Sequence, residues 1–241
     1  KSPDRMDPAK RAFGQYDIPY RIQENAKQVL IVGAGGGNDV AGALRNGAQQ
    51  VTAVEIDPGI IELGREYHPE SPYADPRVKV VVDDARAFFR RDQAHYDVIS
   101  FGLLDAHTQA SSYNNTRIDH YVYTVESFRE ARDRLDERGI LTVSFESPRP
   151  WITGRIGANL REAFGQEPVS FRIPAGHYGW GGTLFVAARD PERLRRLIRN
   201  DLAVERFVEE HPASLQPPQL LSRDDWPYLY LEGRGIPRLH L

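Results

Sequence analysis

Residues 28–57 constrain the fold more than any other stretch, because they place a glycine cluster between two apolar runs. Residues 29–32 have the length and composition of a strand buried on both faces of a parallel sheet. Glycines then dominate residues 33–37, where they permit a sharp turn that exposes backbone N–H groups to a ligand. Residues 51–56 form a second predicted strand with acids at its end. A turn that serves packing alone is the alternative, but this order of elements favours a nucleoside site.

The glycine spacing departs from the dinucleotide fingerprint. That fingerprint requires a third glycine three positions after the second, where helix and strand pack closely. Gly33 and Gly35 fit the first two places, but Asn38 occupies the third. Dinucleotide binding is therefore the less favoured interpretation.

The next two predicted strands also point to a nucleoside. Residues 77–82 form a strand that ends at Asp83, Asp84 and Ala85, and residues 96–100 form the following strand. A carboxylate at this place can accept a hydrogen bond from an adenine amino group, and alanine leaves room for the ring. A helix N-cap is the alternative role for either aspartate. Acids after the second and third strands suit a nucleoside without a diphosphate, so we predict S-adenosylmethionine.

The segment 28–147 resembles the class I S-adenosylmethionine-dependent methyltransferase fold, in particular its spermidine-synthase-like branch. The resemblance is carried by VLIVGAGGGNDV, VTAVEIDPGII, DPRVKVVVDDARAFF, YDVIS and ERGILTVSF. It implies an α/β, Rossmann-like fold with a seven-stranded sheet and helices on both faces. It also implies Glu55 on the ribose, Asp84 and Ala85 at the adenine, and the glycine loop beside the methionine part. The cofactor contacts that we expect are Gly33, Gly35, Gly37, Asp39, Glu55, Ile56, Asp57, Asp83, Asp84 and Ala85.

The substrate half departs from spermidine synthases. Polyamine aminopropyltransferases carry two aspartates after the fourth strand, in a pattern like YDVIxxDxxDP, where this chain reads YDVISFGLLDAH. Gly102 stands at the first position, the usual catalytic acid-base residue of the family, and Asp105 retains the second. Some 27 residues precede the first strand, too few for the β-hairpin domain that covers the polyamine site. Other pieces, such as LLDAHT, resemble bacterial spermidine-synthase-like proteins that are in some cases joined to membrane-spanning segments.

These departures order the functional hypotheses. Methyl transfer from S-adenosylmethionine to a small acceptor, with cationic acceptors included, comes first. Aminopropyl transfer from decarboxylated S-adenosylmethionine to a polyamine is the alternative. A nucleoside-binding domain without catalysis is the third hypothesis.

Candidate catalytic residues follow the fourth strand, on the carboxyl edge where open α/β sheets bind ligands. Asp105 can orient or deprotonate an acceptor, His107 titrates near neutral pH, and Tyr123 can line the pocket. The alternatives are a loop-capping aspartate, an exposed histidine and a core tyrosine. The predicted substrate contacts are Asp105, Tyr121, His177, Trp180 and Asp225. A hairpin turn around residues 177–180 and a tail docked by its aromatics are the structural alternatives, and no metal site is predicted.

Composition limits the partners and the layout. With 241 residues, 40% of them hydrophobic, the chain can bury one substantial core. The net charge of −3 without a basic stripe argues against nucleic acid, and the absence of cysteine fits a reducing, cytoplasmic setting. A homodimer, and membrane segments in a longer parent protein, are left open.

We expect an N-terminal arm over residues 1–27, the cofactor-binding domain over 28–200, and a C-terminal extension packed on it over 201–241. Within the domain, residues 125–135 have the apolar spacing of a helix. Gly139 is expected to end that helix before a strand at residues 140–145.

Overall fold

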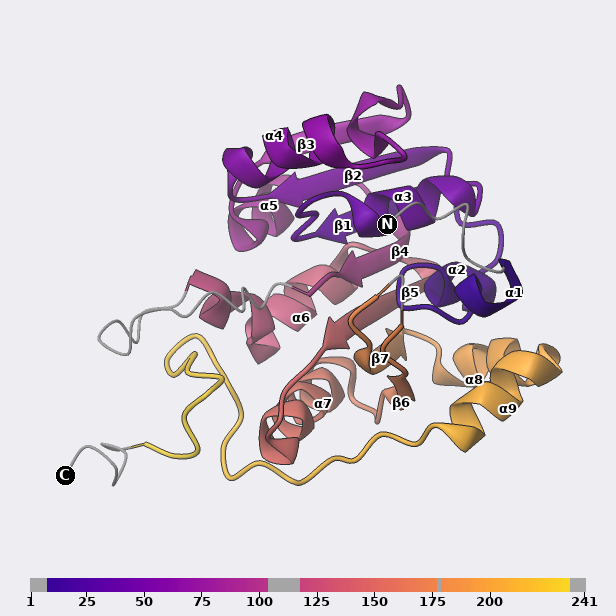
Figure 1. The fold of residues 1–241 in the computed structure, drawn as a ribbon. Coiled ribbons are helices and arrows are strands. Elements are labelled where there is room, and N and C mark those ends of the chain that lie inside the picture. The colour runs from indigo at the N-terminus through magenta and orange to yellow at the C-terminus, as the bar shows by residue number, and fades with distance from the viewer. Residues whose placement is uncertain (1–7, 104–117, 177–178, 235–241) are drawn as a thin grey trace.

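The computed structural model describes residues 8–103, 118–176 and 179–234, and it contains the predicted seven-stranded sheet. The strand order is β3-β2-β1-β4-β5-β7-β6, with β7 antiparallel to both of its neighbours and the other pairs parallel (Figure 1). The strands are β1 (Gln28–Val32), β2 (Gln50–Glu55), β3 (Val78–Val82), β4 (Tyr96–Phe101), β5 (Leu135–Phe145), β6 (Val169–Ile173) and β7 (Gly182–Ala188). The chain runs outward from β1 to β3 and then crosses to β4, so the order reverses between β1 and β4. A crevice at such a reversal is where open α/β sheets bind ligands.

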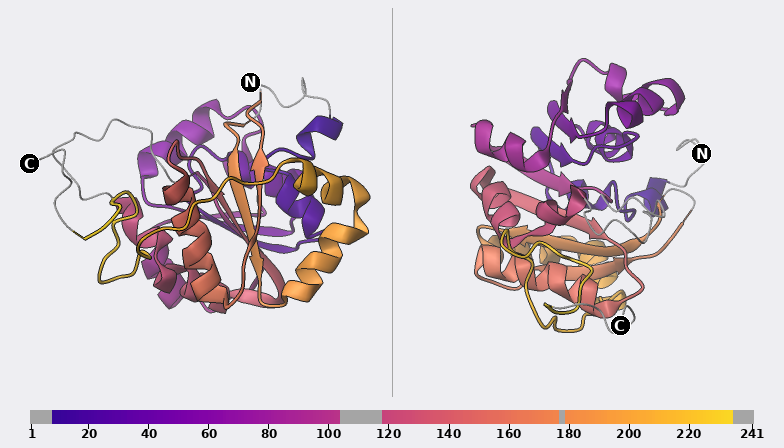
Figure 2. Two further views of the ribbon diagram at one scale, coloured as in Figure 1. Left: turned by 90° about the horizontal axis from the view of Figure 1, so that it is seen from below. Right: turned by 90° about the vertical axis from the view of Figure 1, so that its left-hand side faces the viewer.

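Helices cover both faces of the sheet because side chains alternate along each strand. In β1, Val29 and Ile31 join one hydrophobic core, and Leu30 and Val32 join the other. The first core is covered by α2 (Ile18–Ile22), α3 (Asn38–Arg45), α4 (Pro58–Tyr67), α8 (Pro191–Asn200) and α9 (Leu202–Glu210). The second is covered by α5 (Ala85–Arg91), α6 (Val125–Asp133) and α7 (Pro150–Phe164). The left view of Figure 2 shows α7 on one side of the strands and α8 and α9 on the other.

Shorter elements complete the described chain: α1 (Pro8–Arg11) and the 3₁₀ turns η2 (Pro72–Ala74) and η3 (Ile118–Tyr123). Among the described residues, no helix is both long enough and apolar enough to cross a bilayer.

The predicted boundary between helix and strand near Gly139 is wrong. The helix α6 ends at Asp133, and β5 already begins at Leu135, which pairs with Tyr96. The register shifts before the next pair, so residues 136–139 form a bulge. A Cβ on Gly139 would lie 2.6 Å from the carbonyl oxygen of Tyr96, so the glycine permits close backbone approach instead of ending a helix.

The N-terminal segment is more deeply packed than its polar composition suggests. Ile18, Tyr20 and Ile22 of α2 are all buried in the first core. A Cβ on Gly42 of α3 would lie 2.2 Å from the carbonyl oxygen of Tyr16, so the backbones of the two segments touch. This segment therefore packs against α3, the helix that follows the glycine loop.

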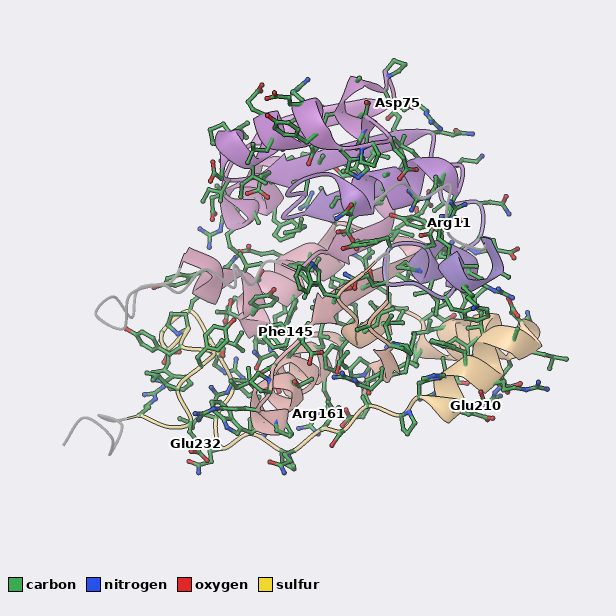
Figure 3. All side chains as sticks on the ribbon, viewed as in Figure 1. Arg11, Asp75, Phe145, Arg161, Glu210 and Glu232 are labelled. Carbon is green, nitrogen blue, oxygen red and sulfur yellow. The ribbon has the colours of Figure 1, made fainter. Side chains whose placement is uncertain are left out.

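The C-terminal segment begins with a helix, α9, that the sequence analysis did not predict, and then runs past α7 (Figure 1). One fully buried side chain, Arg155 of α7, anchors it. The guanidinium donates to five main-chain carbonyl oxygens at 2.5–3.1 Å, those of Leu220, Tyr228, Leu229, Leu231 and Glu232. The rings of Trp151 and Trp226 lie against it, 4.9 and 5.2 Å away. Figure 3 marks Glu232 at this segment and the exposed Arg161 on the same helix.

Candidate functional site

The glycine loop after β1 takes a backbone path that other residues adopt only with strain. Gly33, Gly35 and Gly37 have φ angles of 68°, 52° and 101°, all in the left-handed region. The N–H groups of Gly33 and Ala34 donate to the carbonyl oxygen of Val54 at 2.9 and 3.0 Å. The loop is thus tied to the end of β2 at the crevice between β1 and β4.

Glu55, the last residue of β2, binds the backbone of this loop. Its carboxylate accepts hydrogen bonds from the N–H groups of Gly35 at 2.9 Å, Ile56 at 2.8 Å and Asp57 at 3.0 Å. The hydroxyl of Tyr73 donates to the carbonyl oxygen of Gly35 at 2.6 Å. Burial raises the pKa of Tyr73, and the Glu55 and Asp39 carboxylates raise it further, so the phenol stays a donor at neutral pH. Two side chains therefore preorganise the loop.

The acids after β2 and β3 lie where the sequence places them, and the aspartates also cap helices. Asp57 caps α4 by accepting from the N–H of Gly59 at 2.8 Å, and Asp84 caps α5 by accepting from Ala87 at 2.9 Å. Asp83 accepts from the N–H of Asp84 and forms an ion pair with Arg91. The capping role is thus realised, and adenine recognition by Asp84 stays a prediction.

Two apolar residues border these acids. The side chain of Ile56, directly after Glu55, is exposed, at 47%. Ala85 is buried at the start of α5. The exposed Ile56 side chain offers an apolar surface on which a purine ring can pack.

Asp39, in the first turn of α3, lies at the reversal point between β1 and β4. It is 9% exposed and hydrogen bonds to the side chain of Ser100 on β4. Burial raises the pKa of Asp39 to about 7, Asp17 adds to the rise, and the Ser100 hydrogen bond opposes it. A Cβ on Gly102 would lie 3.1 Å from Oδ2 of Asp39 and 3.0 Å from the carbonyl oxygen of Gly33. The crevice therefore contains a buried carboxylate that titrates near neutral pH.

The predicted catalytic and acceptor residues are only partly visible. Asp105, His107 and His177 lie outside the described residues. Tyr123 has no exposed surface and packs edge-on against Phe145 at a ring distance of 5.4 Å, which supports the core-packing alternative. Figure 3 shows Phe145 in the interior of the molecule.

Two predicted acceptor contacts are exposed. Trp180 is 74% exposed just before β7, and Tyr121 is 49% exposed in η3. Both have the accessibility that an acceptor contact needs. Their roles toward an acceptor stay predictions.

Asp224 and Asp225, the acidic pair near the C-terminus, each bind a different arginine. Asp225 pairs with Arg234 at 3.3 Å, whereas Asp224 binds Arg86 of α5 at 2.8 and 2.9 Å. Arg86 is buried and also binds Glu130 at 2.7 and 3.1 Å. We call the set Arg86, Glu130 and Asp224 the arginine clasp. The sequence analysis missed Arg86, because nothing local links residues 138 positions apart.

The clasp predicts a pH-dependent contribution to stability. The hydrogen bond from Arg86 lowers the pKa of Asp224, so this aspartate stabilises the fold above its ordinary pKa of about 3.9. That stability is lost as the pH falls through the lowered value. Because the carboxylate is 38% exposed, we expect Asp224→Asn to cost only about 1 kcal/mol at pH 7.

Urea unfolding of both proteins between about pH 2 and pH 7 measures this difference, which should shrink toward zero at the acid end. Asp225→Asn, at 68% exposure, is the matched control and should change little at any pH. A cost of Asp224→Asn that stays constant down to the lowest pH would contradict the assignment.

Comparison with known proteins identifies the family. A model of the spermine/spermidine synthase domain matches residues 16–175, more than half of the chain, so this protein belongs to the spermine/spermidine synthase family. A polyamine aminopropyltransferase of Pectobacterium carotovorum subsp. carotovorum is 40% identical over 203 residues, covering 67% of this chain and 70% of the relative. Another, of Korarchaeum cryptofilum, is 29% identical over 152 residues and covers 61% of this chain. The chain spans 44%, 32% and 58% of the length of three such relatives.

The fold comparison agrees with the family. A spermidine synthase crystallised with the transition state analogue AdoDATO superposes with a TM-score of 0.60 at 17% identity. The match covers 92% of this chain and 70% of that one. The predicted Rossmann-like fold and the spermidine-synthase-like resemblance are therefore confirmed.

Proposed function

We propose that this chain transfers an aminopropyl group from decarboxylated S-adenosylmethionine to a small amine of the polyamine class. Family membership supports this alternative over the methyl transfer that the sequence analysis placed first. The observation that carries it is the acidic crevice at the reversal point, where Glu55 and Asp39 flank a preorganised glycine loop. Donor and acceptor are both cationic, and carboxylates match that charge.

The nucleoside is assigned to the carboxyl ends of β1, β2 and β3. A carboxylate offers about four lone-pair positions, and Glu55 uses three for backbone N–H groups, so its oxygens can still accept from a ribose hydroxyl. Ile56 offers an apolar surface to the adenine ring, beside Ala85 and the carboxylate of Asp84. The aminopropyl chain would then extend toward Asp39 and Gly102.

The chemistry requires alignment more than activation. The sulfonium is already a good leaving group, and alignment of nucleophile and carbon is worth about 7–11 kcal/mol. The acceptor amine must lose a proton before it attacks, and a carboxylate within hydrogen-bond reach is suited to take it. The site therefore has to hold two cations close together and remove one proton.

Product analysis tests the proposal. The protein is incubated with decarboxylated S-adenosylmethionine and 1,4-diaminobutane, and in parallel with S-adenosylmethionine and a metabolite extract, before mass spectrometry. We expect 5′-methylthioadenosine together with an aminopropylated amine. S-adenosylhomocysteine with a methylated acceptor would restore the methyl-transfer hypothesis. Ligand-induced thermal stabilisation without either product would support a nucleoside-binding domain.

A further inference from the structure

Asp39 is an acid buried where the proposed reaction takes place. The ion pairs of the described residues include no arginine or lysine that pairs with it, and its polar side-chain partner is the uncharged Ser100. A buried carboxylate without a cationic partner is costly to keep ionised. Such a group at a ligand crevice is a candidate for chemistry, because structure alone is better served by a neutral side chain.

Gly102, directly after β4, lies beside this carboxylate. The Cβ of a side chain built on Gly102 would lie 3.1 Å from Oδ2 of Asp39. The φ angle of Gly102 lies outside the left-handed region, so this dihedral permits a side chain, but the Gly33 carbonyl oxygen and the Asp39 carboxylate lie 3.0 and 3.1 Å from the position of its Cβ. The Asp39 carboxylate, from helix α3, thus lies in the space that the carboxylate of an aspartate at position 102 would need.

A second group near Asp39 lacks a partner. The hydroxyl of Tyr20, on α2, is buried and has no hydrogen-bond partner within the described part of the chain. Burial raises the pKa of Tyr20, and the Asp39 carboxylate raises it further. The surroundings of Asp39 therefore retain an unused polar group that an amine or a water molecule can satisfy.

We propose that Asp39 is the acid-base residue of the transfer reaction and takes the proton of the acceptor amine, in place of an acid at position 102. This inference rests on the proposed function and deepens it. Asp39 is 9% exposed, so the protein does not enclose this residue completely. The assignment extends the role of Asp39 from cofactor contact, as the sequence predicted, to catalysis.

The acceptor ammonium gives one proton to the Asp39 carboxylate, which leaves a neutral amine and a carboxylic acid. The amine lone pair then forms a bond to the aminopropyl carbon attached to sulfur. The carbon–sulfur bond breaks with its electron pair going to the sulfonium, which yields neutral 5′-methylthioadenosine and a new secondary ammonium. Asp39 returns its proton to solvent.

The electrostatic surroundings give this step a pH dependence. Among the described residues, the titratable groups whose charges couple to Asp39 are Asp17, directly before α2, Tyr20 on α2 and Tyr73 on η2, and its hydrogen-bond partner Ser100 on β4 is neutral. With a pKa of about 7, Asp39 is increasingly ionised as the pH rises through neutrality. Turnover should therefore rise through the same range, because only the carboxylate accepts a proton.

Asp39→Asn tests the inference. We expect kcat to fall about 10²–10⁴-fold and the rise near pH 7 to disappear. The affinity for 5′-methylthioadenosine, measured calorimetrically, should stay unchanged, since that nucleoside lacks the aminopropyl amine. The amide keeps the hydrogen bond to Ser100, and thermal unfolding checks that the variant is folded. Asp133→Asn, an exposed aspartate at the end of α6, is the matched control and should keep full turnover.

A relocated carboxylate provides the positive test. The double variant Asp39→Ala with Gly102→Asp should recover part of the turnover that Asp39→Ala alone loses. Removal of the Asp39 side chain relieves its close contact with the Cβ of residue 102, so that the Gly33 carbonyl oxygen at 3.0 Å is the remaining tight contact.

Three results would overturn the inference. Wild-type turnover and pH profile in Asp39→Asn would overturn it alone. A loss of affinity for decarboxylated S-adenosylmethionine, but not for 5′-methylthioadenosine, would assign Asp39 to the donor amine instead. No 5′-methylthioadenosine from the wild-type protein would overturn the proposed function together with this inference.

Discussion

Replacement of Arg155 by methionine should lower the free energy of unfolding by about 3–5 kcal/mol, the range typical of a broken buried polar network. Methionine fills a similar volume but donates no hydrogen bond, so five main-chain carbonyl oxygens lose their donor at once. The contacts with Trp151 and Trp226 also lose their cationic partner. Denaturant unfolding gives the size of the effect, and hydrogen exchange should locate the first loss of protection at residues 220–232.

Arg161 provides the matched control on the same helix. Its ion pair with Glu167 is exposed, at 57% and 69%, so Arg161→Met should change the free energy of unfolding by less than about 1 kcal/mol. Equal effects of the two substitutions would show that Arg155 acts only as a helix residue. A folded Arg155→Met protein with full protection of residues 220–232 would also contradict the anchoring role.

Replacement of Glu55 by glutamine should weaken the binding of 5′-methylthioadenosine about 100-fold or more. A carboxylate accepts from backbone N–H groups and a ribose hydroxyl together, whereas an amide has one acceptor oxygen. Each hydrogen bond to a charged acceptor contributes about 1.5–3 kcal/mol, so the loss of the ribose contact and the loosening of the glycine loop account for this factor. Isothermal titration calorimetry measures it.

Asp57→Asn separates ribose binding from helix capping. Asp57 lies two residues after Glu55, but one of its oxygens caps α4 through Gly59. Loss of this cap should cost about 0.5–2 kcal/mol of stability and should affect nucleoside affinity much less than Glu55→Gln. If Asp57→Asn weakens binding more than Glu55→Gln does, the ribose contact belongs to Asp57.

Local patterns predicted most of the fold. Helix α4 begins at Pro58, directly after the capping Asp57, and both residues are local signals of a helix start. The start of β5 was not predictable in the same way, because Leu135 joins the sheet only through its pairing with Tyr96 across a bulge. Arg155 was missed for a related reason: an arginine in a helical pattern indicates solvent, and its carbonyl partners come 65–77 residues later.

In the candidate site, too, local patterns predicted some features, and other features depend on contacts between residues far apart in the chain. The glycine loop, Glu55 and the acids after β3 follow from strand ends, since the carboxyl ends of parallel strands share one edge. The proximity of Asp39 to Gly102 depends on β1 and β4 being neighbours, and the spacing of these residues in the chain does not reveal it. The burial that raises the pKa of Asp39 likewise depends on α2 and β4, which pack around it only in the folded protein.

The strand order imposes a sequence of events during synthesis. Strand β7 lies between β5 and β6, although the ribosome produces it after both. Until β7 emerges, β6 has no neighbour among the described strands, and the outer edge of β5 offers unpaired backbone groups. A chain that ends before residue 182 therefore lacks the strand that joins β6 to the sheet, and the outer edge of its β5 is open to pairing with another strand.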